Sequence, residues 1–295
     1  MNKYVIPAPT HLCLYDSAHV NHTIFFFNNI SNITNKKDTI KVCIDFSQLI
    51  KLTAAAANYM FSFFTYFQIE KNNNILKFNL PKNPEMKRLF INAGFARAIR
   101  AGGIKKIENL WDDSSFICGN NQDVSKLLTV IKQRSNMSNL PKKLTAAIRE
   151  TLLNINHHAY NKDMSNETIT WWCYFHLGDD ESGKYLSAVI FDRGEGIPSR
   201  IRRAFPYQRN NFDDECISYA MIESVTSTKE LGRGKGSVDM KNPIKFNNIS
   251  TKDQLFVISL KGKYSYEFID GNDKVDTGML DYALNGTMIE WILYY

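Results

Sequence analysis

The chain has 295 residues, of which 44% are hydrophobic and 22% are charged, and its formal net charge at pH 7 is +6. These values are close to globular averages and do not favour extended disorder, and the length suits two domains better than one core. The basic residues are scattered apart from Arg200, Arg202 and Arg203, so the charge pattern does not favour a dedicated nucleic-acid-binding role.

The cysteine spacing indicates a reducing compartment, and the hydropathy indicates a chain without a membrane-spanning segment. The N-terminus has no apolar core of a secretory signal, and the apolar run Leu52–Phe67 contains polar residues and is shorter than the roughly 20 residues of a spanning helix. The five cysteines form no CxxC pair, which favours buried thiols in the cytoplasm over a disulfide framework or a zinc site. They are Cys13, Cys43, Cys118, Cys173 and Cys216.

Residues 1–104 are predicted to form a smaller α/β domain. β-rich runs predict strands, and longer apolar runs that end at turn residues predict helices. The expected strands are Thr23–Phe27, Ile40–Phe46 and Ile75–Leu80, and the expected helices are Leu52–Phe67 and Glu85–Ala93.

Residues 105–122 are predicted to be a linker, and residues 123–295 a second α/β domain. Helical patterning covers Asp123–Arg134, Leu140–Tyr160 and Asp213–Val225. The expected strands are Thr168–Leu177, Tyr185–Phe191, Leu255–Leu260, Tyr264–Ile269 and Thr287–Leu293. The tripeptide Asn285–Gly286–Thr287 is by itself typical of a hairpin turn.

Glu150, Asn154 and His158 recur every four residues inside a predicted helix, so they are expected on one helical face. A carboxylate and a carboxamide one turn apart can handle a water and a hard cation such as Mg²⁺. Taken alone, the pattern also fits a solvated polar stripe.

Two glycine-containing segments follow. Asp192 ends a predicted strand, and Gly194 and Gly196 after it would let a flat ligand approach the backbone. Further on, alternating glycines flanked by basic residues suit a mobile loop whose N–H groups bind phosphates. That loop contains Lys229, Gly232, Arg233, Gly234, Lys235, Gly236 and Ser237, and its spacing is that of neither a Walker A nor a GxGxxG motif. Alone, the two segments fit an ordinary turn and a flexible linker.

In their order and spacing these pieces resemble the GHKL superfamily of ATP-binding domains, which includes DNA gyrase and the histidine kinases. The resemblance implies an α+β two-layer sandwich, the Bergerat fold, over 123–295. Glu150–Asn154 matches the N box of that family, and Asp192–Gly194–Gly196 matches its first glycine box. The loop Gly232–Gly236 matches the second, and Glu-x-x-x-Asn-x-x-x-His-Ala is closest to the histidine-kinase and anti-sigma-factor-kinase branches.

The resemblance implies a role for each matched residue. Asn154 would ligate Mg²⁺, Glu150 would position or deprotonate the attacking nucleophile, and Asp192 would bind the adenine amine with support from Thr287 through water. Gly194 and Gly196 would let the base approach. Lys229 and the glycine loop would cover the phosphates, with roles left open for Arg233, Lys235 and His158. Ser237 departs from the leucine of many relatives.

ATP and Mg²⁺ are therefore the expected ligands. The presence of Glu150 favours a slow ATPase that acts as a bacterial regulatory switch on a protein partner. Alternatives are a protein Ser/Thr kinase of the anti-sigma type and a non-hydrolysing adaptor in a regulatory or defence system. The chain carries no preceding phosphoacceptor helix pair and no following transducer domain, which argues against a sensor kinase and a gyrase. A homodimer is plausible from the family.

The N-terminal domain resembles the STAS domain of anti-sigma-factor antagonists over about 24–104. The resemblance rests on Val42–Ala56, where a strand ends in Asp45, and on Met86–Phe95. Where that family has a phosphorylatable Ser, this chain has Thr53 followed by alanines. Because the hydroxyl that phosphorylation needs is largely missing, an interaction module without phosphorylation is favoured.

Overall fold

The computed structural model describes residues 3–36, 41–71, 76–99, 109–111, 115–120, 123–135, 137, 139–160, 169–222, 236–247 and 249–295. The chain divides into two compact units, Met1–Ile117 and Cys118–Tyr295. The boundary falls inside the segment 105–122 that the sequence predicts to be a linker. Each unit contains both helices and strands, so the prediction of a mixed α/β protein is confirmed.

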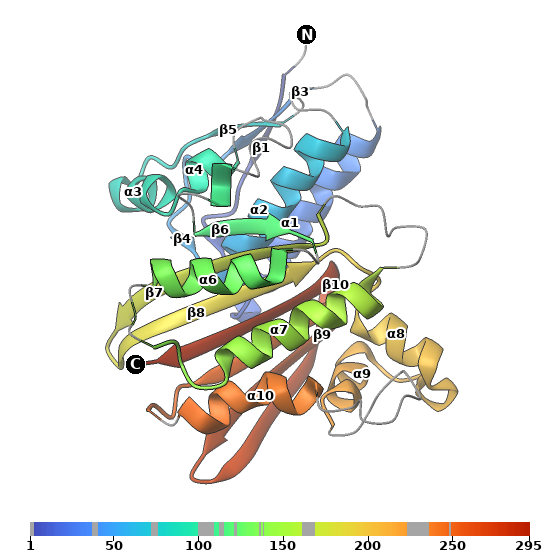
Figure 1. Cartoon of the computed structure of the whole chain (residues 1–295). Coiled ribbons are helices and arrows are strands. Elements are labelled where there is room, and N and C mark those ends of the chain that lie inside the picture. Colours follow the sequence, from blue (N-terminus) through green and yellow to red (C-terminus); the bar gives the residue numbers. More distant parts are fainter. Residues whose placement is uncertain are drawn as a thin grey trace. The chain divides into compact units, whose positions relative to one another are not determined.

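The first unit is built on a parallel three-stranded sheet in the order β1-β3-β5. Helices connect these strands (Figure 1). Fully buried phenylalanines, among them Phe27, Phe46, Phe64 and Phe90, fill the core. The strands are β1 (Lys3–Pro7), β3 (Lys41–Asp45) and β5 (Leu76–Asn79), with a short parallel pair β2 (His11–Leu12) and β4 (Lys51–Leu52). The helices are α1 (Ser17–Lys36), α2 (Ala54–Tyr66), the π-helical turn η1 (Phe67–Lys71), α3 (Pro84–Asn92) and α4 (Phe95–Ala98).

The predicted strand Thr23–Phe27 is wrong, because these residues lie in the middle of α1. The run of β-formers hides a helical period, since Val20, Ile24, Phe27 and Ile30 are all buried on one side of the helix. The helix start is fixed by Asp16, whose Oδ1 accepts the backbone N–H of Ala18 at 2.8 Å. Packing of that face therefore overrides the local strand preference.

The second unit is built on a five-stranded sheet in the order β6-β7-β8-β10-β9. Neighbouring strands from β7 to β9 pair antiparallel, and β10 lies between β8 and β9. The strands are β6 (Phe116–Gly119), β7 (Trp171–Asp180), β8 (Gly183–Asp192), β9 (Gln254–Ile269) and β10 (Asn272–Tyr294). This pairing places the end of β8 beside the middle of β10.

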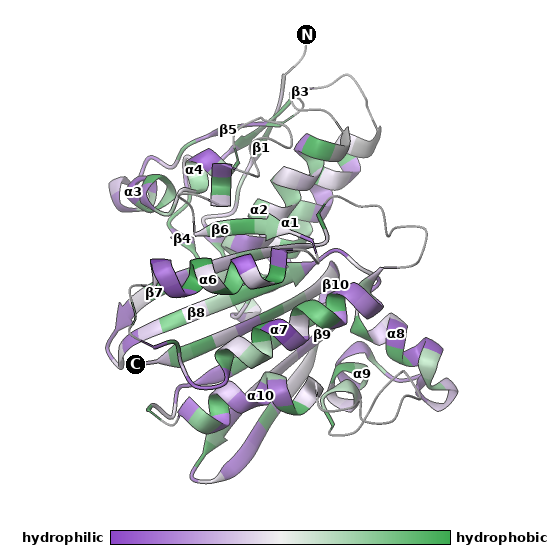
Figure 2. Ribbon diagram, in the orientation of Figure 1, coloured by the Kyte–Doolittle hydropathy of each residue, from purple (hydrophilic) through white to green (hydrophobic). Residues whose placement is uncertain are grey.

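Figure 1 shows α6, α7 and α10 across one face of this sheet. In Figure 2 these helices carry both hydrophobic and hydrophilic residues, as expected for helices with one face on a sheet. The indole N–H of Trp291 on β10 donates to the carbonyl of Met240 on α10 at 2.8 Å. The helices are α6 (Val124–Arg134), α7 (Leu144–Asn154) with the π-helical turn η3 (Ile155–Ala159), α8 (Ile197–Ala204), η5 (Pro206–Gln208), α9 (Asp213–Ala220) and α10 (Gly236–Asn247).

Two predictions about the closing strands need correction. Leu255–Leu260 and Tyr264–Ile269 form one continuous strand, β9, in which Leu260 has a positive φ of 53°. Gly262 lies within this strand, at a point where β9 passes close to the backbone of Asp213. Asn285–Gly286–Thr287 is not a hairpin turn either, since it lies inside β10 at a shift in the pairing with β9.

All five cysteine side chains are buried, as the sequence predicts. Among the helices that the structure describes, none combines the length and apolar character needed to cross a membrane.

Candidate functional site

The helix α7 forms because apolar residues recur with helical spacing. Its buried residues are Leu144, Ala147, Ile148, Thr151 and Leu152. Glu150 and Asn154 lie off this stripe and are half-buried, and His158 follows in η3 with similar exposure. The structure therefore gives α7 a polar face with a carboxylate and a carboxamide one turn apart.

Asp192 ends β8 with its side chain buried. The carboxylate accepts the backbone N–H of Gly194 at 2.8 Å and also the backbone N–H of Thr287. Burial raises the pKa of Asp192 to about 7, and the two backbone hydrogen bonds oppose this rise. The described residues form no ion pair with Asp192, and the two hydrogen bonds to its carboxylate come from backbone N–H groups.

Asp192, Thr287 and Ser259 form one row across three neighbouring strands, because Thr287 of β10 is opposite Asp192 of β8 and opposite Ser259 of β9. Ser259 is fully buried, and its Oγ lies 2.9 Å from Oγ1 of Thr287. Gly286 precedes this row with a φ of 118°, and a Cβ there would overlap the carbonyl oxygen of Asp192. Only glycine fits that position.

The loop after Asp192 is held by the end of η3. The carbonyl of Ala159 accepts the backbone N–H of Glu195 at 2.9 Å, and the hydroxyl of Tyr160 accepts the N–H of Arg193 at 3.1 Å. A Cβ on Gly194 would overlap the Ala159 carbonyl oxygen. In this structure Gly194 therefore lets the loop after Asp192 pack closely against η3.

Gly196 ends the same loop against β9. A Cβ on Gly196 would lie 2.8 Å from Cγ of Leu260 and 3.1 Å from Oγ of Ser259. The next residue, Ile197, donates its backbone N–H to Ser259 Oγ at 2.9 Å. Gly196 thus lets the start of α8 pack against the strand that carries Ser259.

The start of α10 lies beside α7. A Cβ on Gly236, the first residue of α10, would lie 2.5 Å from Oε1 of Glu150. Ser237 is buried, and its hydroxyl donates to the carbonyl of Ile222 at 3.0 Å. The other predicted loop residues lie outside the described part of the chain; they are Lys229, Gly232, Arg233, Gly234 and Lys235.

His158 lies near α8, with Nδ1 3.4 Å from an Nη atom of Arg200. This contact connects η3 to the helix that follows the Asp192 loop. His158 therefore has a packing contact within the protein.

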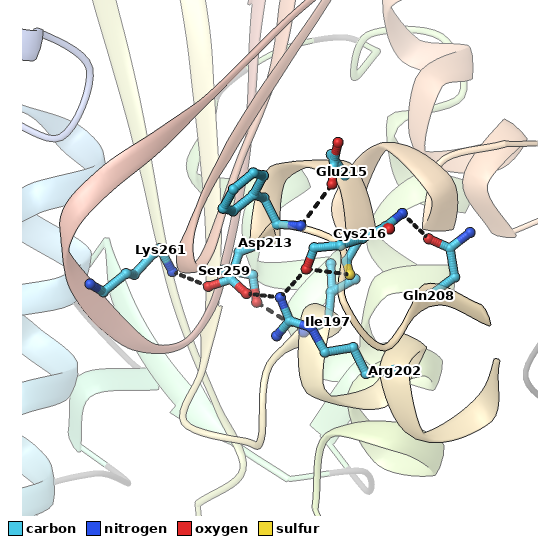
Figure 3. Close-up of polar contacts among 10 residues, drawn as sticks. Ile197, Arg202, Gln208, Asp213, Glu215, Cys216, Ser259 and Lys261 are labelled. Carbon is cyan, nitrogen blue, oxygen red and sulfur yellow. Dashed lines mark hydrogen bonds and ion pairs between the residues drawn. The ribbon is translucent and has the colours of Figure 1, made fainter. Parts of the chain in front are cut away.

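A partly buried ion pair connects the elements around the row. Arg202 of α8 donates to Asp213 Oδ1 at 2.6 Å, and the backbone N–H of Lys261 on β9 donates to Asp213 Oδ2 at 2.9 Å. Figure 3 shows these donors converging on Asp213, with Ile197 and Ser259 in the same view. Asp213 thereby joins α8, α9 and β9.

A cavity of about 620 Å³ opens beside α9, and it contains none of the predicted site residues. Glu215, Tyr219 and Ile222 line one side of it, and Lys241 and Tyr264 line another. Ile222 immediately precedes the segment 223–235, which lies outside the described residues. This cavity is therefore separate from the row that Asp192, Thr287 and Ser259 form at the end of β8.

Asn154 is the only metal ligand that the sequence predicts, and it belongs to the described residues. Within the described ranges, no three His, Cys, Asp or Glu side chains gather as they would for a metal site of protein carboxylates or imidazoles. Asn154 supplies one amide oxygen on the polar face of α7, and Mg²⁺ commonly combines few protein ligands with phosphate oxygens and water.

Tyr160 and Ser259 contact the segments around Asp192, and sequence reasoning did not single them out. The signal for Ser259 is a lone polar residue within the apolar run Leu255–Leu260. Comparison with protein-family models found none that matches this chain, and comparison with curated proteins found no match either.

Proposed function

We propose that the second unit binds Mg-ATP in the manner of a GHKL domain, with the base at Asp192 and the phosphates between α7 and the start of α10. The observation that carries this proposal is the buried Asp192 carboxylate, which faces two backbone N–H groups at a strand end. A buried carboxylate without a cationic partner costs free energy and is typical of a binding site. An exocyclic amine would supply the missing donor.

The geometry near α10 supports a phosphate position. Glu150 and Asn154 share the polar face of α7, and the N-terminus of the 12-residue helix α10 lies against Glu150. Helix N-termini favour anions because their first N–H groups have no intrahelical partner. Bound Mg²⁺ would neutralise phosphate charge, and the amide oxygen of Asn154 would hold it.

Glu150 gives the proposed site a base for hydrolysis. Its carboxylate can orient or deprotonate a water beside the phosphates. We therefore propose a slow ATPase in which the bound nucleotide stabilises one conformation and hydrolysis resets it, so that the chain acts as a regulatory switch on a protein partner.

The first unit is proposed to be the interaction module of this switch. Thr53, the one hydroxyl at the position where STAS domains are phosphorylated, is half-buried, and its Oγ1 lies 3.5 Å from the carbonyl oxygen of Leu12. Its backbone N–H donates to the same carbonyl at 3.0 Å. These contacts direct Thr53 toward the protein and support a role without phosphorylation.

The test of hydrolysis is phosphate release from Mg-ATP by the wild type and by Glu150→Gln. We expect Glu150→Gln to bind Mg-ATP with similar affinity and to release phosphate at least about 100-fold more slowly, because the base is lost. Glu181→Gln in the exposed β7–β8 turn is the matched control and should hydrolyse at the wild-type rate. Equal turnover by Glu150→Gln would contradict the role of Glu150, and transfer of labelled phosphate to a protein would indicate a kinase instead.

A further inference from the structure

Ser259 is a hydroxyl residue buried in an otherwise apolar strand segment. It is 0% exposed and stands directly opposite Thr287, which in turn stands opposite Asp192. A buried hydroxyl costs free energy unless it is hydrogen-bonded. Three polar groups surround Ser259 Oγ: the Ile197 N–H at 2.9 Å, the Gly286 carbonyl oxygen at 3.1 Å and Thr287 Oγ1 at 2.9 Å.

All three contacts can be hydrogen bonds at the same time in only one arrangement of the two hydroxyl protons. A serine hydroxyl has one proton to donate and two lone pairs to accept with. The Ile197 N–H occupies one lone pair, and the Ser259 proton goes to the carbonyl of Gly286. The contact with Thr287 then uses the second lone pair, so Thr287 donates its hydroxyl proton to Ser259.

Thr287 is left with acceptor lone pairs only, and the ionised carboxylate of Asp192 beside it is also an acceptor. A base that presents an amine to this pair offers the donors that both need. A base that presents a carbonyl brings a third acceptor, and the buried groups stay without a donor.

We propose that Ser259 determines base specificity: by accepting the Thr287 hydroxyl proton, it makes the row select a 6-amino purine over a 6-oxo purine. This role rests on the proposed nucleotide site. Ser259 acts through Thr287 and is therefore a positioning residue.

The experiment compares the affinities of Mg-ATP and Mg-ITP, whose base carries a carbonyl in place of the amine, by calorimetry at pH 8. The wild type should prefer Mg-ATP by about 100-fold, because a site with buried acceptors rejects an analogue that lacks the donor. In Ser259→Ala the Thr287 proton is free to reach the carbonyl, so the preference should fall about tenfold. Equal weakening of both ligands would overturn the proposal.

Two controls separate orientation from loss of packing. In a Thr287→Val background, Ser259→Ala should leave the preference unchanged, because there is no hydroxyl to orient. A cysteine side chain has nearly the same shape as serine but forms only weak hydrogen bonds. Ser259→Cys should therefore lower the preference as Ser259→Ala does, and it replaces the alanine variant if that variant does not fold. A wild-type preference in Ser259→Cys would contradict the role.

A readout without nucleotide tests the network itself. Hydrogen exchange of the Ile197 amide should be faster in Ser259→Ala than in the wild type, since its acceptor is removed. Unchanged exchange would overturn the proposed bond directions. If the wild type bound neither nucleotide, the proposed function would fail and this role with it. If it bound Mg-ATP and the preference did not move, only the role of Ser259 would fail.

Discussion

Asp192 combines burial with a charge that no ion pair among the described residues neutralises. Burial raises its pKa from the ordinary value of 3.8 to about 7, and this effect outweighs the opposing hydrogen bonds from Gly194 and Thr287. Below pH 7 the side chain is an acid that can donate a proton, and above pH 7 it only accepts. An amine on a bound base needs the accepting form.

Binding of Mg-ATP should therefore depend on pH through Asp192. Below pH 7 we expect the affinity to fall by up to about tenfold for each pH unit, because protonation removes the negative charge of Asp192 and weakens its hydrogen bond with the amine. Calorimetry between pH 5.5 and 8, in buffers with different ionisation heats, should show proton release near pH 6 and little above pH 8. Constant affinity over this range would contradict the assignment.

Asp253 provides a matched control for this titration. It is another buried aspartate with a raised pKa, and it accepts the backbone N–H of Tyr294 at 2.8 Å, far from the row. Asp253→Asn should keep the pH dependence of the wild type, whereas Asp192→Asn should bind weakly at every pH.

At the scale of elements, Asp213 joins α8, α9 and β9, and thereby supports the strand that carries Ser259. It pairs with Arg202 and caps the Lys261 N–H, and its side chain is 11% exposed. Removing the Asp213 carboxylate would leave the Arg202 charge and the Lys261 N–H without the acceptor that they bind.

We expect Asp213→Ala to lower the free energy of unfolding by about 2 to 3 kcal/mol, measured by urea denaturation. Lys274→Ala is the control, because its ion pair with Glu267 is on the surface, with Lys274 65% exposed, and its loss should change stability little. An Asp213→Ala variant as stable as Lys274→Ala would show that the pair does not brace these elements.

Elements with a clear period were predictable from sequence, and those decided by tertiary contacts were not. The predicted helix Asp123–Arg134 is α6, Val124–Arg134, since its apolar residues repeat with helical spacing. Thr23–Phe27 was mistaken for a strand because four consecutive large residues obscure the period of α1. β10 begins 15 residues before the predicted Thr287, because its first half is exposed and lacks an apolar signal.

The positions of the candidate residues in the fold were predictable where these residues are grouped along the chain. Glu150 and Asn154 share one face of α7, and Asp192 ends a strand as expected. Ser259 and Tyr160 belong to the site through pairing of strands and loops that are distant in sequence, and periodicity does not reveal such pairing. Gly194 and Gly196 were expected to admit a base, and the structure uses both for contacts with its own chain.

At the scale of the whole molecule, the predicted nucleotide residues that the structure describes belong to the second unit, and the first unit has a parallel sheet of its own. A ligand that binds the folded second unit should stabilise it by mass action. Ligand binding can therefore be compared between the wild type and variants that each change one buried carboxylate, at Asp192 or at Asp253.

Calorimetric titration of the full chain with Mg-ATP at pH 8 tests the central claim most directly, with Asp192→Asn and Asp253→Asn in parallel. The account predicts about one nucleotide bound per chain, an affinity at least about 100-fold weaker in Asp192→Asn, and wild-type affinity in Asp253→Asn, because only Asp192 accepts the amine. Absence of binding by the wild type, or equal binding by Asp192→Asn, would contradict it.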